Sequence, residues 1–233
     1  MTAIDFPDVE ATIRTLRNSL DSCGRKSAIK PRTQKKFKDW TRDLDSVLLQ
    51  INSIDKKFLD RIGSDLGSCS PDRNHLLIAL IQPNMKKVFK EIRDDPRIDP
   101  ECIPAGDDLD FLIGAHVITR SLAWAGDNVV NSIIFKNIWS PEKTVQKLHE
   151  DRQKLEENKN LTGLCDRWEL FEHRLHLDFV DRKIAGPDKI KGTLTEAVFG
   201  IIFLEQGVVN EQKALSLIMN PGKKPAPGQH DSG

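Results

Sequence analysis

The chain has 233 residues, 38% of them hydrophobic and 30% charged, which is typical of one sizeable globular domain or of a domain with a helical extension. Lysine plus arginine equals aspartate plus glutamate at 35 each, so no global basic field indicates nucleic acid. No apolar run approaches the roughly 20 residues of a membrane span. Neither a signal peptide nor a presequence is expected, and the scattered cysteines favour reduced thiols in a cytoplasmic or nuclear protein.

Helical periodicity runs through most of the chain, whereas strand signals are scarce, with no tyrosine and no Asn-Gly or Asp-Gly turn. One long amphipathic helix is expected where a single apolar stripe continues from Trp40 to Ile62. The sequence therefore predicts an all-α fold, with helices at residues 7–20, 34–62, 74–81, 85–92, 107–138, 141–156, 158–168, 189–205 and 210–219.

A break in this periodicity at residues 63–73, with two glycines and Pro71, indicates a domain boundary near residue 70. We expect an N-terminal helical extension at 1–70 and a helical domain at 71–220. The remaining segment, 221–233, is polar and rich in proline and glycine, and we expect it to be disordered.

Two apolar helical segments each contain a single acid, Asp127 in Ser121–Val130 and Glu196 in Lys191–Gly200. Burying a carboxylate is costly unless something pairs with it, and Gly126 would allow close approach of another backbone beside Asp127. A divalent cation shared by the two acids would account for them. Mg²⁺ suits such a site because it needs only one or two carboxylates together with waters and substrate phosphates.

Thr193 lies three residues before Glu196 on the same helix face, where it would add a hydroxyl ligand or hold a metal-bound water. The alternative is structural, with each acid paired to a basic side chain or capping a helix.

Four segments resemble motifs of the ribonuclease III family, in order and spacing, across about residues 74–220. Leu76–Asn84 is similar to the opening A-L-T-H-x-S motif, although its His and Ser are absent. Leu122–Val130 resembles the signature helix E-F-L-G-D-A-V-L, and Arg152–Leu161 resembles R-x-x-L-V-x-N-x-x-L. Thr193–Glu205 is similar to D-x-x-E-A-L-I-G-A-I-Y-L-D.

This resemblance implies an all-helical homodimer that cleaves double-stranded RNA with Mg²⁺, or with Mn²⁺ in its place. It also implies that Asp127 and Glu196 are metal ligands. The family's other two acids fall on Ala123 and Thr193 here, as in inactive ribosomal and scaffold members of the fold. The short Mini-III branch resembles this chain at both places, with L-A-Y-L-G-D and T-A-F-E, and is active, so we expect activity.

We expect no double-stranded RNA-binding domain after the helical domain, so the grip on RNA must come from elsewhere in the chain. A basic cluster near the N-terminus, with Asp39 as its one acid, would contact phosphates without reading sequence. Its alternative is a solvated loop and helix start. The cluster comprises Arg25, Lys26, Lys30, Arg32, Lys35, Lys36, Lys38 and Arg42.

The predicted function is a dimeric, metal-dependent endoribonuclease that acts on double-stranded or structured RNA. In this prediction Asp127 and Glu196 hold the magnesium that activates the attacking water. One alternative is a non-catalytic member of the fold that binds RNA or a ribonucleoprotein partner. Another is a helical protein-interaction module in which both acids are structural.

Overall fold

The computed structural model describes residues 6–25, 30–98, 106–156, 158–177, 186–207 and 210–221, and these are helical almost throughout. Within these residues no strand is present, and only an isolated parallel bridge joins Ile81 to Leu175. The predicted all-α fold is confirmed, whereas the predicted disordered tail falls on residues 222–233, outside the described part. The helices are α1 (Val9–Gly24), α2 (Pro31–Asn52), α3 (Lys56–Leu66), α4 (Arg73–Leu80), α5 (Met85–Arg93), α6 (Gly106–Ile138), α7 (Val145–Glu156), α8 (Asn158–Trp168), α9 (Pro187–Gln206) and α10 (Glu211–Met219).

The long helix expected at residues 34–62 is two helices, so that prediction was wrong. Helix α2 ends at Asn52, and α3 begins after Asp55, whose carboxylate accepts a hydrogen bond from the backbone N–H of Phe58 at 2.8 Å. An aspartate in this position satisfies one of the free N–H groups of a first turn and so starts a new helix. The break is not visible in the sequence because the apolar stripe continues across it. Ile51 before the break, Ile54 within it and Phe58 after it are all buried.

The N-terminal helices are bonded to the later part of the chain as well as packed on it. The guanidinium of Arg73, at the start of α4, donates to Glu10 of α1 at 2.7 Å and to the carbonyl oxygens of Ile51 and Ile54 at 3.0 Å each. Buried apolar side chains from α1, α2 and α3 belong to one continuous core with those of the later helices. The extension therefore holds a defined position on the helical domain.

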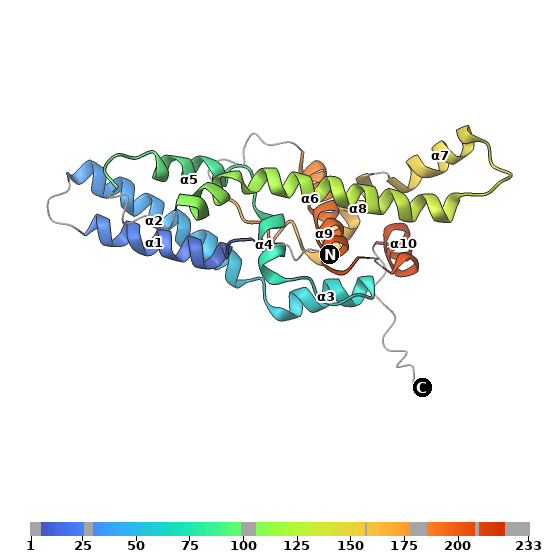
Figure 1. The fold of residues 1–233 in the computed structure, drawn as a ribbon, viewed down its shortest axis with the longest axis horizontal. Helices are drawn as coiled ribbons and strands as arrows, with labels where there is room; N and C mark the ends of the chain where they lie inside the picture. Colours follow the sequence, from blue (N-terminus) through green and yellow to red (C-terminus); the bar gives the residue numbers. More distant parts are fainter. Residues whose placement is uncertain are drawn as a thin grey trace, which may run out of the picture.

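Helices α6 and α9 cross in direct backbone contact near the middle of the molecule (Figure 1). A Cβ atom added to Gly126 of α6 would lie 1.7 Å from the carbonyl oxygen of Glu196 in α9. One added to Gly200 of α9 would lie 2.1 Å from the carbonyl oxygen of Leu122 in α6. Since real Cβ atoms do not come this close to other atoms, the crossing requires glycine at both positions.

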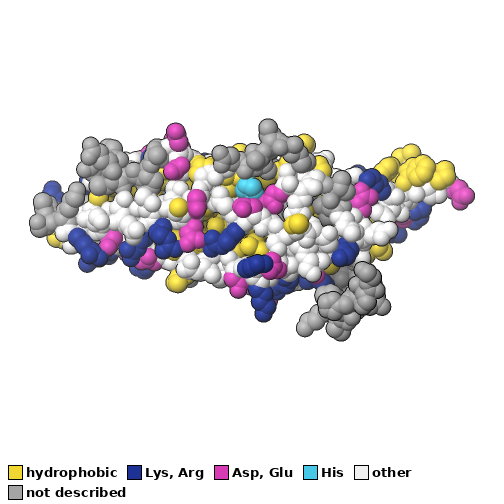
Figure 2. Space-filling model, turned by 60° about the horizontal axis from the view of Figure 1, so that its bottom comes forward, with side chains coloured by type: hydrophobic (Ala, Val, Ile, Leu, Met, Phe, Trp, Pro, Cys, Tyr) yellow, Lys and Arg dark blue, Asp and Glu magenta, His cyan; other side chains and the backbone are white. Residues whose placement is uncertain are grey.

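The end of α6 and helix α7 project from the body of the molecule as an arm (Figure 1). Its side chains Phe135, Trp139 and Val145 are 49%, 56% and 84% exposed. Figure 2 shows hydrophobic side chains gathered at this end of the molecule. Despite the length of α6, no helix among the described residues is both long and apolar enough to span a membrane.

The Gly126–Gly200 contact can be tested with a matched pair of substitutions in α6. Gly126→Ala should destabilise the fold by roughly 1–3 kcal/mol or more, because its methyl group would force the two backbones apart. Gly114→Ala should instead stabilise the fold by about 0.5–1 kcal/mol, because nothing lies within 4 Å of its added Cβ and alanine favours helix. Urea unfolding followed by circular dichroism measures both. Equal effects of the two substitutions would contradict the crossing.

Candidate active site

The helix crossing brings together the two acids that the sequence singles out. Asp127 follows Gly126 in α6 and is exposed, while Glu196 lies in α9 and is half-buried, with its own carbonyl oxygen against Gly126. Burial raises the pKa of Glu196 to about 7, and the nearby negative charge of Asp127 adds to the shift. The two side chains are therefore close enough for their charges to interact.

Neither acid has a basic partner. Asp127 and Glu196 form no ion pair or hydrogen bond with another described residue, and no cation offsets the raised pKa of Glu196. The structural alternative for these acids requires a paired lysine or arginine or a capping interaction, and the described chain provides neither. Two adjacent carboxylates without a counter-charge form a site of local negative potential.

The positions of the two absent family acids lie on the same pair of helices. Ala123 is buried at 5% exposure, one turn before Asp127. Thr193 is half-buried, one turn before Glu196, and its hydroxyl donates to the carbonyl oxygen of Lys189 at 3.0 Å. That bond uses the hydroxyl hydrogen and leaves the oxygen lone pairs of Thr193 free to accept.

The oxygen ligands present at the crossing fit a magnesium ion. Mg²⁺ needs few protein ligands and keeps several waters, and its double positive charge would offset the two unpaired carboxylates. The described residues contain no cluster of three or more His, Cys, Asp or Glu side chains of the kind that encloses a metal completely. An ion held by the two carboxylates would keep coordination positions for water and for a substrate phosphate.

A cavity of about 220 Å³ lies between the first half of α6, the start of α9 and the turn after α4. Its lining includes His116, Thr119 and Arg120 from α6, with Lys189 and Thr193 from α9. Arg120 and Lys189 were not predicted from the sequence as site residues. The spacing of residues could have indicated them. Each cation lies seven residues before an acid on its own helix, which places it two turns away on the same face.

The basic cluster near the N-terminus divides into paired and unpaired side chains. Arg25 contacts Asp21 at 2.7 Å, and Arg42 contacts Asp39 at 3.4 Å. Lys26 lies outside the described residues. Four cations of the cluster are exposed and make no ion pair with the described chain, namely Lys30, Arg32, Lys35 and Lys38.

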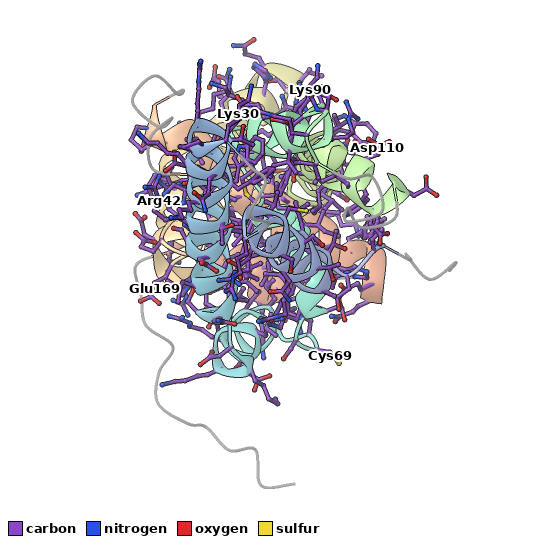
Figure 3. All side chains as sticks on the ribbon, turned by 90° about the vertical axis from the view of Figure 1, so that its left-hand side faces the viewer. Lys30, Arg42, Cys69, Lys90, Asp110 and Glu169 are labelled. Atoms are coloured by element: carbon purple, nitrogen blue, oxygen red, sulfur yellow. The ribbon has the colours of Figure 1, made fainter. Side chains whose placement is uncertain are left out.

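Lys36 attaches the start of α2 to the loop after α5. It contacts the carboxylate of Asp95 at 3.2 Å, and that carboxylate is 2% exposed. The guanidinium of Arg97, hydrogen-bonded to the same carboxylate, holds the pKa of Asp95 well below its usual range. Lys36, Lys87 and Lys90 line a shallow cavity of about 480 Å³, and Lys30 and Lys90 both lie toward the top of the view in Figure 3.

Comparison with known protein families gives a match within the predicted helical domain. Residues 120–207, which include both acids of the helix crossing, match the ribonuclease III domain. This part of the chain is a ribonuclease III domain, and the assignment made from the sequence motifs is confirmed. The segment compared with the opening family motif, Leu76–Asn84, precedes the matched range. No curated protein and no solved structure gives a significant match to the chain.

The family match indicates a ribonuclease-type function for this part of the chain. Domains of this family generally act on RNA and use divalent metals. The matched range contains both helices of the Gly126–Gly200 contact and therefore the whole of the carboxylate pair.

The raised pKa of Glu196 predicts a pH-dependent stability. The folded protein favours the neutral carboxyl, so ionised Glu196 destabilises the fold progressively from its ordinary pKa of 4.5 to about 7, and fully above that. Glu196→Gln should therefore raise the unfolding midpoint at pH 8 and change it little at pH 4.5, in the presence of a chelator. Thermal unfolding at the two pH values measures this. The exposed Glu142→Gln is the control, and an equal effect of Glu196→Gln at both pH values would contradict the assignment.

Proposed function

We propose that this protein is a metal-dependent endoribonuclease that cleaves double-stranded or structured RNA as a homodimer. One observation carries the proposal: within a ribonuclease III domain, two carboxylates without a basic partner in the described chain lie near enough to interact electrostatically, where α6 and α9 are in backbone contact. Asp127 and Glu196 would hold Mg²⁺ or Mn²⁺, and the Thr193 oxygen would accept from a metal-bound water.

Each residue of the site has a part in this proposal. A bound divalent ion supplies an activated water and neutralises charge on the phosphodiester under attack. Glu196 must lose its proton to serve as a ligand, so metal binding should strengthen as the pH rises through its pKa of about 7. The glycine contact fixes the separation of the acids, because neither helix backbone can shift without breaking it.

A second candidate is a non-catalytic member of the family that binds RNA or a ribonucleoprotein partner. The observation that favours it is the presence of Ala123 and Thr193 at the positions of two family acids. With only two carboxylates in the site, the protein would hold one ion weakly and bind duplex RNA without cutting it.

Cleavage of a plain RNA duplex separates the two candidates. Purified protein should cut labelled duplex RNA with Mg²⁺ present and not with a chelator. Asp127→Asn and Glu196→Gln should each lower the rate by at least about 100-fold, since even the outer-shell partners of metal ligands are typically worth 10–100-fold.

The matched control is Asp107→Asn, which changes an exposed acid in the first turn of the same helix and should leave the rate unchanged. Full cleavage by Asp127→Asn would refute the metal assignment. Duplex binding without cleavage by the unaltered protein would favour the second candidate.

An apolar groove beside the acids supports the homodimer. Its volume is about 470 Å³, and Val129, Ile133 and Phe203 line it together with Trp124, which is 72% exposed. A large exposed tryptophan beside an apolar groove is typical of a surface that another protein covers. We propose that a second copy of the chain covers it, since a two-fold interface pairs the same patch on both subunits.

If a second copy covers the groove, a polar substitution of Trp124 should weaken the dimer. Trp124→Ser should lower the molar mass in solution from that of two chains to that of one, measured by analytical ultracentrifugation across a concentration series. Leu49→Ser is the control, because Leu49 is 71% exposed but lies in α2, away from the groove. An unchanged mass for Trp124→Ser, or a monomeric unaltered protein, would contradict the proposed interface.

The N-terminal basic cluster is the proposed second contact to RNA. The unpaired cations of α2 and its start, Lys30, Arg32, Lys35 and Lys38, are the part free to meet phosphates. Arg25, Lys36 and Arg42 are already matched by acids and are less available. Because α2 contributes to the common core, single charge substitutions suit this cluster better than deletion of the extension.

A further inference from the structure

The 220 Å³ cavity beside the carboxylate pair has two cations without partners. Arg120 of α6 and Lys189 of α9 line it, both are exposed, and neither forms an ion pair with another described residue. Arg167, by contrast, contacts the carboxylate of Asp65 at 2.6 Å. Two unpaired cations on one cavity therefore indicate a site for an anion.

The position of these cations follows from helical spacing. Arg120 lies two turns before Asp127, and Lys189 lies two turns before Glu196, each on the same helix face as its acid. At about 1.5 Å per residue, seven residues place each cation about 10 Å from its acid along the axis. At this distance the cations do not neutralise the acids. The pKa of Glu196 is accordingly raised by burial and by Asp127, and neither cation lowers it. They are close enough to belong to the same binding surface.

The rest of the lining combines apolar side chains, among them Ile81, Ile190 and Leu194, with polar ones such as His116 and Thr119. His116 donates from Nδ1 to the carbonyl oxygen of Ile113 at 3.3 Å, so its Nε2 is not used by that bond. Thr119 is buried, with its hydroxyl bonded to the carbonyl oxygen of Ile78 in α4 at 2.8 Å. A cavity of this volume holds a phosphate group with several waters, since one water occupies about 30 Å³ in the liquid.

We propose that this cavity is a phosphate subsite, in which Arg120 and Lys189 bind a second backbone phosphate of the RNA strand that reaches the Asp127–Glu196 pair. This inference rests on the proposed function, in which RNA is the substrate, and adds a second place where the protein contacts that RNA. A second anion site two helical turns, about 10 Å, from the acids lies farther than one phosphate step along the strand. Binding phosphates at both places would fix the strand's direction across the crossing. Phosphate contacts of this kind position a nucleic acid without reading its sequence.

The test uses the full chain and the double variant Arg120→Gln, Lys189→Gln, with Lys57→Gln as the matched control. Lys57 is exposed in α3 and has no ion-pair partner in the described chain. Duplex RNA affinity is measured with a chelator present at several salt concentrations. The double variant should bind roughly 10- to 100-fold more weakly, with a salt slope lower by about 1, while Lys57→Gln matches the unaltered protein. Equal affinity and equal slope in the double variant would overturn the subsite.

A second measurement separates an RNA phosphate from free phosphate. The imidazole signals of His116, assigned by comparison with His116→Gln, are followed by NMR as inorganic phosphate is added at constant ionic strength. The subsite predicts a shift in the unaltered protein that the double variant loses. A phosphate response combined with unchanged duplex binding would assign the cavity to free phosphate and refute the RNA contact. No response in either measurement would refute the site altogether.

Failure of the subsite and failure of the nuclease proposal give different results. If duplex is cut with Mg²⁺ and the double variant binds it normally, the function stands and the subsite falls. If the double variant loses binding as expected but no duplex is cut with any divalent ion, the subsite stands and the non-catalytic candidate is favoured. Circular dichroism melting of the double variant checks that its fold is retained.

Discussion

The backbone contact between α6 and α9 is the constraint on which the rest of the structure depends. Gly126 and Gly200 let the two helices touch without intervening side chains, with the carbonyl oxygens of Glu196 and Leu122 where a Cβ would otherwise be. A contact this close sets both the distance between the helices and their register. Because Asp127 adjoins one glycine and Glu196 lies one turn before the other, the same contact that builds the core also brings the two carboxylates together.

Three features follow one another along this helix pair, and their order has a chemical logic. The cavity with Arg120 and Lys189 lies on one side of the crossing, the two acids lie at the crossing, and the apolar groove lined by Val129, Ile133 and Phe203 extends to the other side. Positive, negative and apolar surfaces thus succeed one another over a short distance. Such an arrangement suits a phosphate backbone held on one side of a hydrated cation, with a protein partner covering the other side.

Some basic side chains of the N-terminal helices and the loops they contact hold the fold together, and others are exposed to solvent. Lys36 and Arg97 compensate the buried carboxylate of Asp95, and Arg73 connects α1, α2 and α4 through a carboxylate and two carbonyl oxygens. These cations are used in holding the extension in place. The unpaired lysines at the start of α2 are attached to a rigid element as a result, which lowers the entropic cost of any contact they make with phosphates.

The sequence by itself determined the helices and the family, because periodicity and capping act over a few residues and the motifs of α6 and α9 are local. It also singled out Asp127 and Glu196, since lone acids in apolar runs stand out in any helix. It did not show the interruption at Asp55, because the apolar stripe continues across it. Only the tertiary structure decided that Gly200 faces Gly126, that Arg120 and Lys189 share a cavity, and that Lys36 has Asp95 as its partner. Contacts between residues tens of positions apart depend on how the helices pack, and no short-range pattern records them.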